Sequence, residues 1–262
     1  MTTWPDYRSR YLPAMTRAQI EALPDRESAL VLLTTGAVEQ HGPHLPVGVD
    51  ALMGQAWLQR VLPRLPEKAP VYVAPPVQVG KSNEHHGFPG TLIVSRRSLR
   101  VLLLATARQL AKWGFRRLAF INTHGGNVAV LRIVVRELNA DGFETSILRF
   151  SGGATLSGRE AAYGIHAGEV EASWMADVIP ERVDLSKANC CWIGSNDQPG
   201  VLRPEFAPAT YAWKTLDISP TGTMGDATEA SRGKGAAWME TGVERLRESI
   251  MEKVSLRTGA GW

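Results

Sequence analysis

The sequence predicts an α/β fold with a largely parallel central sheet, and three observations support this prediction. Short apolar runs of strand length alternate with longer stretches whose apolar residues recur at helical spacing. Glycine or proline ends several of these segments. Polar loops that carry histidine follow three of the apolar runs, where the ligands of parallel α/β sheets bind. We see no internal repeat and no clear linker, so we expect a single domain over residues 1–262.

The first expected strand covers residues 29–34, because the sequence ALVLLT reads as a short buried strand. Apolar residues then recur at helical spacing after Asp50, and Pro63 ends this helix. The second expected strand covers residues 71–74 and stops at Pro75.

A long helix is expected over residues 98–113, which are rich in Leu and Ala and stop at Gly114. The third strand follows directly over residues 117–121, with the sequence RLAFI. Residues 127–139 place their apolar side chains on one side of a helix. The fourth strand is expected over residues 145–150.

The last part of the chain is less regular. We expect a helix over residues 169–178 and a long final helix from about residue 227 to residue 254. Residues 187–226 lie between them and are rich in Pro, Gly, Asn and aromatic residues. Long irregular segments of this kind are often lids or binding loops, but an oligomer contact or a plain surface excursion fits equally well.

Composition excludes several classes of protein. The charged share is 21% and the formal net charge is only +3, without a run of Lys or Arg, so we expect no nucleic-acid partner. No stretch approaches the length of a membrane span, and the N-terminus lacks the apolar core of a signal peptide. The two cysteines, Cys190 and Cys191, are adjacent, which makes a disulfide framework implausible. These features predict a cytoplasmic protein.

The histidines are the most informative residues. All of them lie in short segments rich in Gly and polar residues, and none lies in an apolar helical stripe; they are His41, His44, His85, His86, His124 and His166. Three of these segments follow the first three expected strands. Because the carboxyl ends of parallel strands meet at one edge of the sheet, we expect these loops to converge there.

The spacing of four residues indicates a metal site. Glu39 and His41 are two residues apart, so in an extended backbone their side chains project to the same side. Asp50 follows a Gly/Pro-rich turn at a helix start, which can return its carboxylate to the same point. His124 precedes Gly125-Gly126, where the backbone can bend tightly. Carboxylate and imidazole sets suit zinc, iron or manganese, and two carboxylates, one of them bridging, also suit a pair of ions.

A further cluster, His166-Ala167-Gly168-Glu169-Val170-Glu171, stands at the start of an expected helix. Acidic residues at a helix start favour the helix dipole, and this is how we interpret Glu171. For His166 and Glu169 the spacing leaves a site role and a structural role equally open.

Four ordered segments, GAVEQHGPHLPVGVD, NEHHGFPGTL, NTHGGN and HAGEVEAS, resemble the signature segments of the creatininase (creatinine amidohydrolase) family. The later segment GTMGDAT also resembles one of that family, so the resemblance runs from residue 36 to about residue 228. It implies a three-layer α/β/α sandwich with a mostly parallel sheet and two divalent metal ions, usually Zn²⁺, with Fe²⁺ or Mn²⁺ in one position. It also implies a homohexamer built as a trimer of dimers. Carried over by motif, Glu39, His41, Asp50 and His124 match metal ligands, with Asp50 as the bridge.

Departures from the family pattern bear on the substrate. Creatininases proper carry Tyr-Glu after the histidine that matches His124, and that Glu binds metal; here Gly125-Gly126 stands instead. The other branches share Gly-Gly and take their last carboxylate from the HAGE segment, so we assign Glu169 as the fifth ligand. Ile165 stands where creatininases proper have a Glu, and Ala172 stands where a Thr is usual. These changes argue against creatinine as substrate.

We therefore predict a metal-dependent amidohydrolase that cleaves a C–N amide bond of a small cyclic amide or formamide with metal-activated water. His166 would stabilise the oxyanion or protonate the leaving nitrogen. Two alternatives remain: a peptidase acting on a modified peptide precursor, and a non-catalytic metal-binding subunit. His85 and His86 would hold substrate, orient ligands or simply pack the loop, and Trp192 would cap a planar substrate or lie at a subunit interface.

Overall fold

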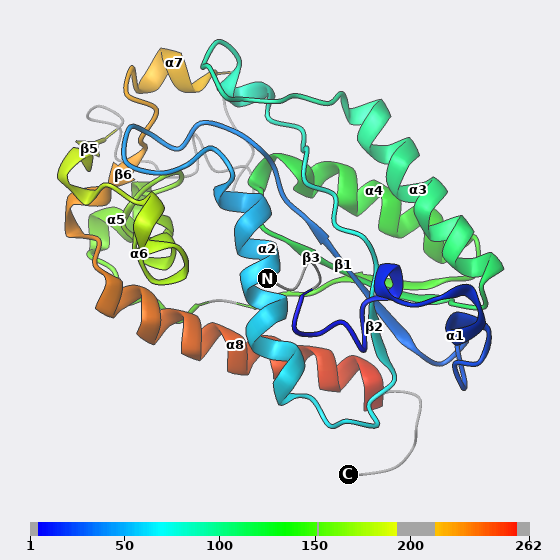
Figure 1. Cartoon of the computed structure of the whole chain (residues 1–262). Coiled ribbons are helices and arrows are strands. Elements are labelled where there is room, and N and C mark those ends of the chain that lie inside the picture. Colours follow the sequence, from blue (N-terminus) through cyan, green and yellow to red (C-terminus); the bar gives the residue numbers. More distant parts are fainter. Residues whose placement is uncertain (1–4, 151, 193–212, 256–262) are drawn as a thin grey trace.

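The computed structural model describes residues 5–150, 152–192 and 213–255 of the chain. Its centre is a parallel sheet (Figure 1), in which the described strands follow the order β2-β1-β3-β4. The strands are β1 (Leu30–Thr35), β2 (Val71–Val73), β3 (Arg117–Asn122) and β4 (Glu144–Ile147). In the register of the sheet, Leu30 of β1 lies opposite Val71 of β2 and Arg117 of β3. The expected parallel sheet is confirmed.

Helices cover both faces of this sheet, as side-chain alternation along the strands requires. The longer helices are α2 (Val49–Val61), α3 (Arg96–Lys112), α4 (Val128–Ala140), α6 (Glu169–Val178) and α8 (Arg232–Ser255). Val31 and Leu33 of β1 pack in one buried cluster with α3 and α4. Leu30 and Leu32 pack in another with α2, α6 and α8. The three-layer α/β/α arrangement is therefore confirmed.

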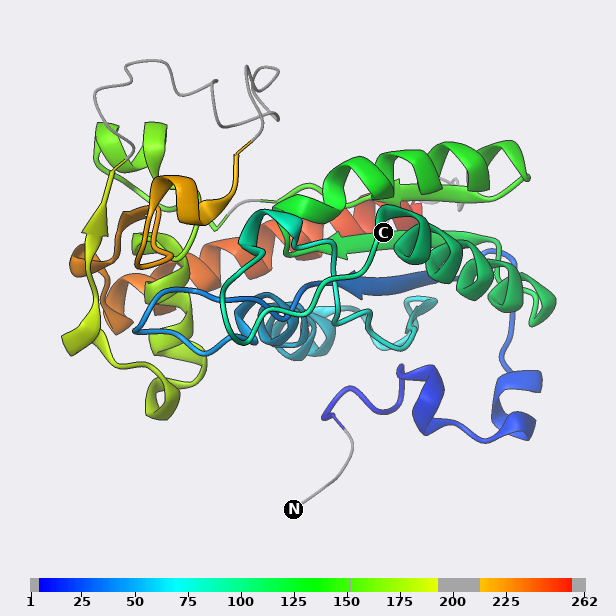
Figure 2. The same cartoon turned by 90° about the horizontal axis from the view of Figure 1, so that it is seen from above.

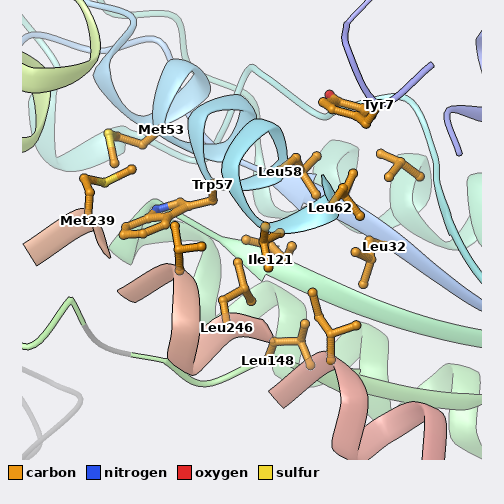
Figure 3. Close-up of a cluster of buried hydrophobic side chains, with 14 of the residues drawn as sticks. Tyr7, Leu32, Met53, Trp57, Leu58, Leu62, Ile121, Leu148, Met239 and Leu246 are labelled. Carbon is orange, nitrogen blue, oxygen red and sulfur yellow. The ribbon is translucent and has the colours of Figure 1, made fainter. Parts of the chain in front are cut away.

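The core between α2, α8 and the sheet is centred on Trp57, which is 2% exposed. Figure 3 shows the Trp57 indole between the two helices, with Met53 and Met239 beside it. Its ring also makes edge contacts with Phe150 and Trp174, at centroid distances of 5.1 and 5.5 Å. This packing fixes the start of α2, which carries Asp50, relative to α6.

Most of the shorter elements gather at one end of the molecule. They are α5 (Gly158–Tyr163), α7 (Thr215–Ile218) and the antiparallel pair β5 (Cys190–Cys191) and β6 (Gly225–Asp226). The exception is α1 (Arg17–Glu21), which lies apart at the N-terminal side. In both views α5, β5, β6 and α7 lie together, and the loop after β1 extends toward them (Figures 1 and 2). This end of the molecule carries the candidate site.

Two element boundaries differ from the sequence prediction by more than two residues. The fourth strand ends at Ile147 rather than at residue 150. The final helix begins at Arg232 rather than near residue 227, because residues 227–229 form a separate 3-10 turn capped by the Asp226 side chain. In the part of the chain that the structure describes, no helix is long and apolar enough to cross a membrane.

Of the irregular segment 187–226, residues 193–212 lie outside the described residues. Trp192 is described, and the Arg159 guanidinium lies 4.8 Å from the centroid of its ring. Trp213 lines a cavity beside the candidate site.

Candidate metal centre

The loops that follow β1 and β3 meet the starts of α2 and α6 at the carboxyl end of the sheet. Glu39 and His41 follow β1, Asp50 lies in the first turn of α2, and His124 follows β3. All four side chains are at most 5% exposed. The close approach of the β1 loop to α2 depends on Gly36, because a Cβ there would lie 2.8 Å from the backbone nitrogen of Ala51. Four of the five ligands assigned from the sequence are thus brought together.

One group of potential ligand atoms comes from Glu39, Asp50 and His124, which lie within 4.8 Å of one another. His124 Nδ1 lies 3.3 Å from Glu39 Oε1 and 3.1 Å from Asp50 Oδ2. The other ring nitrogen, Nε2, lies 3.1 Å from the carbonyl oxygen of Lys81. A carbonyl can only accept, so Nε2–H donates to it. That bond leaves the Nδ1 lone pair directed at the two carboxylates.

His41 stands on the other side of Asp50. Its Nδ1–H donates to the carbonyl oxygen of Glu39 at 2.9 Å, so its Nε2 carries the free lone pair. That Nε2 lies 3.6 Å from Asp50 Oδ1 and 3.9 Å from Glu171 Oε2. Asp50 therefore turns one oxygen toward His41 and the other toward His124, which is the arrangement expected of a bridging carboxylate.

The arrangement of these side chains suits a bound cation better than it suits hydrogen bonds among the side chains themselves. Within the described residues, Glu39 Oε2, His41 Nε2 and Asp50 Oδ2 are buried without a hydrogen-bond partner. Burial alone lowers the pKa of His41, but the carboxylates of Asp50, Glu171 and Glu39 together outweigh it and raise the pKa to about 9. Burial also lowers the pKa of His124, but the Asp50 and Glu39 carboxylates outweigh it and raise this pKa well above its ordinary value. The carboxylates therefore favour a positive charge at this point. A bound cation would replace the protons that they otherwise stabilise on the two imidazoles.

His166 lies between two other imidazoles. Its ring centroid is 4.2 Å from that of His41 and 4.1 Å from that of His85. Its Nε2–H donates to the carbonyl oxygen of Gln40 at 2.7 Å, and its Nδ1 lies 3.7 Å from Glu39 Oε1. Burial, followed by the charges of His41 and His85, lowers its pKa well below the ordinary value. His166 is therefore a neutral imidazole with a free acceptor nitrogen at the cluster.

The structure does not bring Glu169 to this cluster. Its carboxylate pairs with Lys234 Nζ at 2.7 Å, and no group of converging ligand atoms among the described residues includes it. Glu171 is there instead, grouped with His41 and His166. Its Oε2 accepts a hydrogen bond from the backbone N–H of Ala167 at 2.6 Å. Glu169 as the fifth ligand stays a prediction, and the structure favours Glu171 for that role. Two residues along a helix correspond to about 200° of rotation, so the two carboxylates leave α6 on different sides.

Three further side chains hold the cluster in place. Gln40 Nε2–H donates to His85 Nδ1 at 2.9 Å, so His85 presents Nε2–H to Glu39 Oε1 at 3.3 Å. His44 Nε2–H donates to the carbonyl oxygen of Ala167 at 3.1 Å, and Ala167 has the unusual φ of 54°. His86 is exposed and has no such role. Gln40 was not singled out from the sequence, where nothing distinguishes a structural amide from a loop residue.

Two cavities meet at the cluster. One, of about 560 Å³, is bordered by Glu39, His166 and Ile165. The other, of about 1070 Å³, extends from the same point toward β4 and α6. Asp50, His124 and Glu171 border both. A ligand in either cavity would contact the candidate metal centre.

Comparison with known proteins gives consistent matches over most of the chain. The model of a family described as creatinine amidohydrolase matches residues 13–250. A mycofactocin precursor peptide peptidase of Mycobacterium ulcerans (strain Agy99) is 36% identical over 210 residues, 78% of either chain. A creatinine amidohydrolase of Pseudomonas putida is 29% identical over 273 residues, covering 94% of this chain and 98% of the relative.

Solved structures agree with this. A creatininase described as the Mn form superposes with a TM-score of 0.72 at 26% identity, covering 94% of this chain and 99% of the other. A creatininase variant described as Zn-Zn type gives a TM-score of 0.72 at 25% identity, covering 94% and 98%.

Proposed function

Because the chain belongs to the creatinine amidohydrolase (creatininase) family, we propose that it is a dinuclear metal-dependent hydrolase that cleaves a C–N amide bond with water. The observation that carries this proposal is the position of Asp50, which turns one carboxylate oxygen toward His41 and the other toward His124. A single carboxylate so placed can serve two adjacent ions, and paired ions clamp both oxygens of a hydrolytic reaction.

The residues divide into two ligand sets. Glu39, Asp50 and His124 would hold one ion, and His41, Asp50 and Glu171 the other. Imidazole and carboxylate donors suit Zn²⁺, and Mn²⁺ or Fe²⁺ fit the same set. The relatives described as Mn and Zn-Zn creatininases support this choice of metals. When bound, such ions polarise a carbonyl group and lower the pKa of water.

The protein's own groups would position the substrate and move the proton. His166 is held by Gln40 with its Nδ1 free, so it can accept a proton at that atom and pass it to the leaving nitrogen. Burial lowers its pKa, so the imidazole is neutral before the reaction and its Nδ1 lone pair is available. His85 holds Glu39 through Nε2–H and thereby orients a ligand.

The amide could belong to a small molecule or to a peptide. A small cyclic amide or formamide fits the cavity of about 560 Å³ bordered by His166. A peptide precursor is favoured by two observations: the adjoining cavity of about 1070 Å³, and the 36% identity to a mycofactocin precursor peptide peptidase. Ile165, which stands beside His166, removes the acidic neighbour expected of a creatininase.

A metal-content and turnover experiment tests the proposal. Purified protein would be analysed for bound metal and assayed on formamides, lactams including creatinine, and short peptides, before and after chelation and reloading with Zn²⁺ or Mn²⁺. Single variants Glu39→Gln, His41→Ala and His124→Ala should lose metal and activity, whereas His86→Ala, an exposed histidine, should retain both.

Full metal content in all three ligand variants would refute the assignment. Metal binding without turnover of any amide would instead favour a non-catalytic metal-binding subunit. Light scattering of the same samples tests the homohexamer that the family resemblance implies.

A further inference from the structure

The larger cavity continues from the candidate metal centre along β4, the edge strand of the described sheet. Asp50, His124 and Glu171 form its inner end, and its wall on that side is the carboxyl end of the sheet. A substrate whose amide lies at the metal centre could therefore extend into this cavity. The side chains that line it farther out would decide which substrate fits.

Three arginines line the outer part of this cavity: Arg132, Arg136 and Arg149. Arg132 and Arg136 are one turn apart on α4, so they lie on the same face of that helix, and Arg149 follows β4. All three are exposed, and no hydrogen bond or ion pair to a described residue is found for any of them. Some arginines of the same sheet and helices are paired, as Arg117 is with Glu144 and Arg100 with Glu137.

The cavity also holds buried polar atoms without a partner. Thr145, which is 5% exposed, and Trp174 both line it, and Thr145 Oγ1 and Trp174 Nε1 are buried with no hydrogen bond to any described residue. Burying a polar group unpaired is costly, so such atoms usually have a bound partner. Trp57 and Phe150 give the same cavity an aromatic wall. Positive charge, unpaired polar atoms and aromatic surface thus occur together.

We propose that this cavity binds an anionic group of the substrate, a carboxylate or a phosphate, through Arg132, Arg136 and Arg149, while the scissile amide lies at the metal centre. This inference rests on the proposed function. Guanidinium groups bind carboxylate and phosphate oxygens in pairs, which gives both charge and direction. Arg132 borders both cavities. An uncharged substrate such as a simple lactam would leave all three charges unused.

The test measures binding rather than turnover. Metal-loaded protein would be titrated calorimetrically with phenyl phosphate, benzoate and benzamide, which share one ring and differ in charge. The variants are the triple change Arg132→Gln, Arg136→Gln and Arg149→Gln, the matching triple change to Lys, and Arg97→Gln, an exposed arginine of α3 as control. Because the ligands are unchanged, any direct contact of the anion with metal contributes equally to every variant.

We expect the triple Gln variant to bind at least one of the two anions about tenfold more weakly, the loss expected for charge-assisted hydrogen bonds at an exposed site. Benzamide binding and the Arg97→Gln variant should be unchanged, and the Lys variant should lose less than the Gln variant. The anion that loses more affinity identifies the group, carboxylate or phosphate. Unchanged affinity for both anions, or an equal loss for benzamide, would overturn the proposal.

The two proposals can fail separately. A protein that hydrolyses amides but binds anions equally well without the three arginines refutes only the anion site. A protein that hydrolyses no amide but shows arginine-dependent anion binding retains the site and refutes only the proposed function.

Discussion

Glu171→Gln best distinguishes the ligand set that the structure favours, which includes Glu171, from the set assigned by motif, which includes Glu169. The Glu171 carboxylate accepts the Ala167 N–H at 2.6 Å and lies 3.9 Å from His41 Nε2. A glutamine side chain has the same shape and keeps one carbonyl oxygen, so the bond to Ala167 can persist. The negative charge and the ligand are lost, and the backbone that carries His166 stays in place.

The expected loss follows from the number of ligands. The second ligand set, His41, Asp50 and Glu171, would keep only the neutral His41 of its own and would share the Asp50 carboxylate with the other ion. Changing a residue that merely orients a ligand costs about 10–100-fold in metal affinity. Losing a charged ligand should exceed this, so we expect the second ion to bind at least about 100-fold more weakly, or roughly 2.7 kcal/mol.

Metal stoichiometry by elemental analysis, followed by titration of the depleted protein with Zn²⁺, measures this loss. Glu169→Gln is the matched control, two residues away on the same helix. It breaks the 2.7 Å pair with Lys234, whose side chain is 37% exposed, and should lower the free energy of unfolding by only about 1 kcal/mol while both ions remain. Two tightly bound ions in Glu171→Gln, or the loss of one ion in Glu169→Gln, would refute the reasoning.

Three other substitutions test the surroundings of the site. Burial lowers the pKa of His44 to about 4. The neutral side chain therefore contributes its full stability at pH values above about 6.5, and this contribution is lost as the pH falls from about 6.5 to about 4. Urea unfolding should show about 2 kcal/mol less acid destabilisation between pH 7 and 5 in His44→Gln than in the unmodified chain; an equal loss in both proteins would contradict the shift. Gly235→Ala would place a Cβ 1.8 Å from a backbone carbonyl oxygen of α6 and should lower the free energy of unfolding by about 2 kcal/mol or more. A Cβ at Gly233 meets nothing within 4 Å, so the control Gly233→Ala should leave thermal stability unchanged or slightly raised. Gly126→Ala should weaken metal binding, whereas Gly125→Ala, where a Cβ also meets nothing within 4 Å, should not, and equal metal content in the two variants would count against this.

Much of the fold could be predicted because its strands and helices are strongly patterned. β1 and β3 are buried along nearly their whole length, so their apolar runs are unmistakable. Boundaries failed where a side chain redirects the chain, as Asp226 does by capping the turn that precedes α8. The resulting start of α8 at Arg232 depends on that cap and on packing against α6, neither of which periodicity reveals.

The candidate site divides in the same way. Glu39 and His41 could be paired from the sequence because alternate residues of an extended loop project to one side. The motif led us to Glu169 and not to Glu171, because both residues suit a helix start and the sequence does not show which side of α6 faces the candidate site. Arg132 and Arg149 could not be linked at all, because they become neighbours only through the cavity between α4 and the end of β4.

The position of Glu171 follows from the space around His124. A Cβ at Gly126 would lie 2.3 Å from the Lys81 carbonyl oxygen, 2.4 Å from Glu84 Oε1 and 2.5 Å from His124 Nε2. The bare backbone of Gly126 therefore lets the Lys81 carbonyl approach and fix the orientation of the His124 ring. A ligand-bearing side chain at this position would occupy the same space and break that bond. In the proposed ligand set the loop after β3 therefore supplies an imidazole but no carboxylate. Glu171, which faces His41 at the start of α6, would supply the remaining negative charge from the other side.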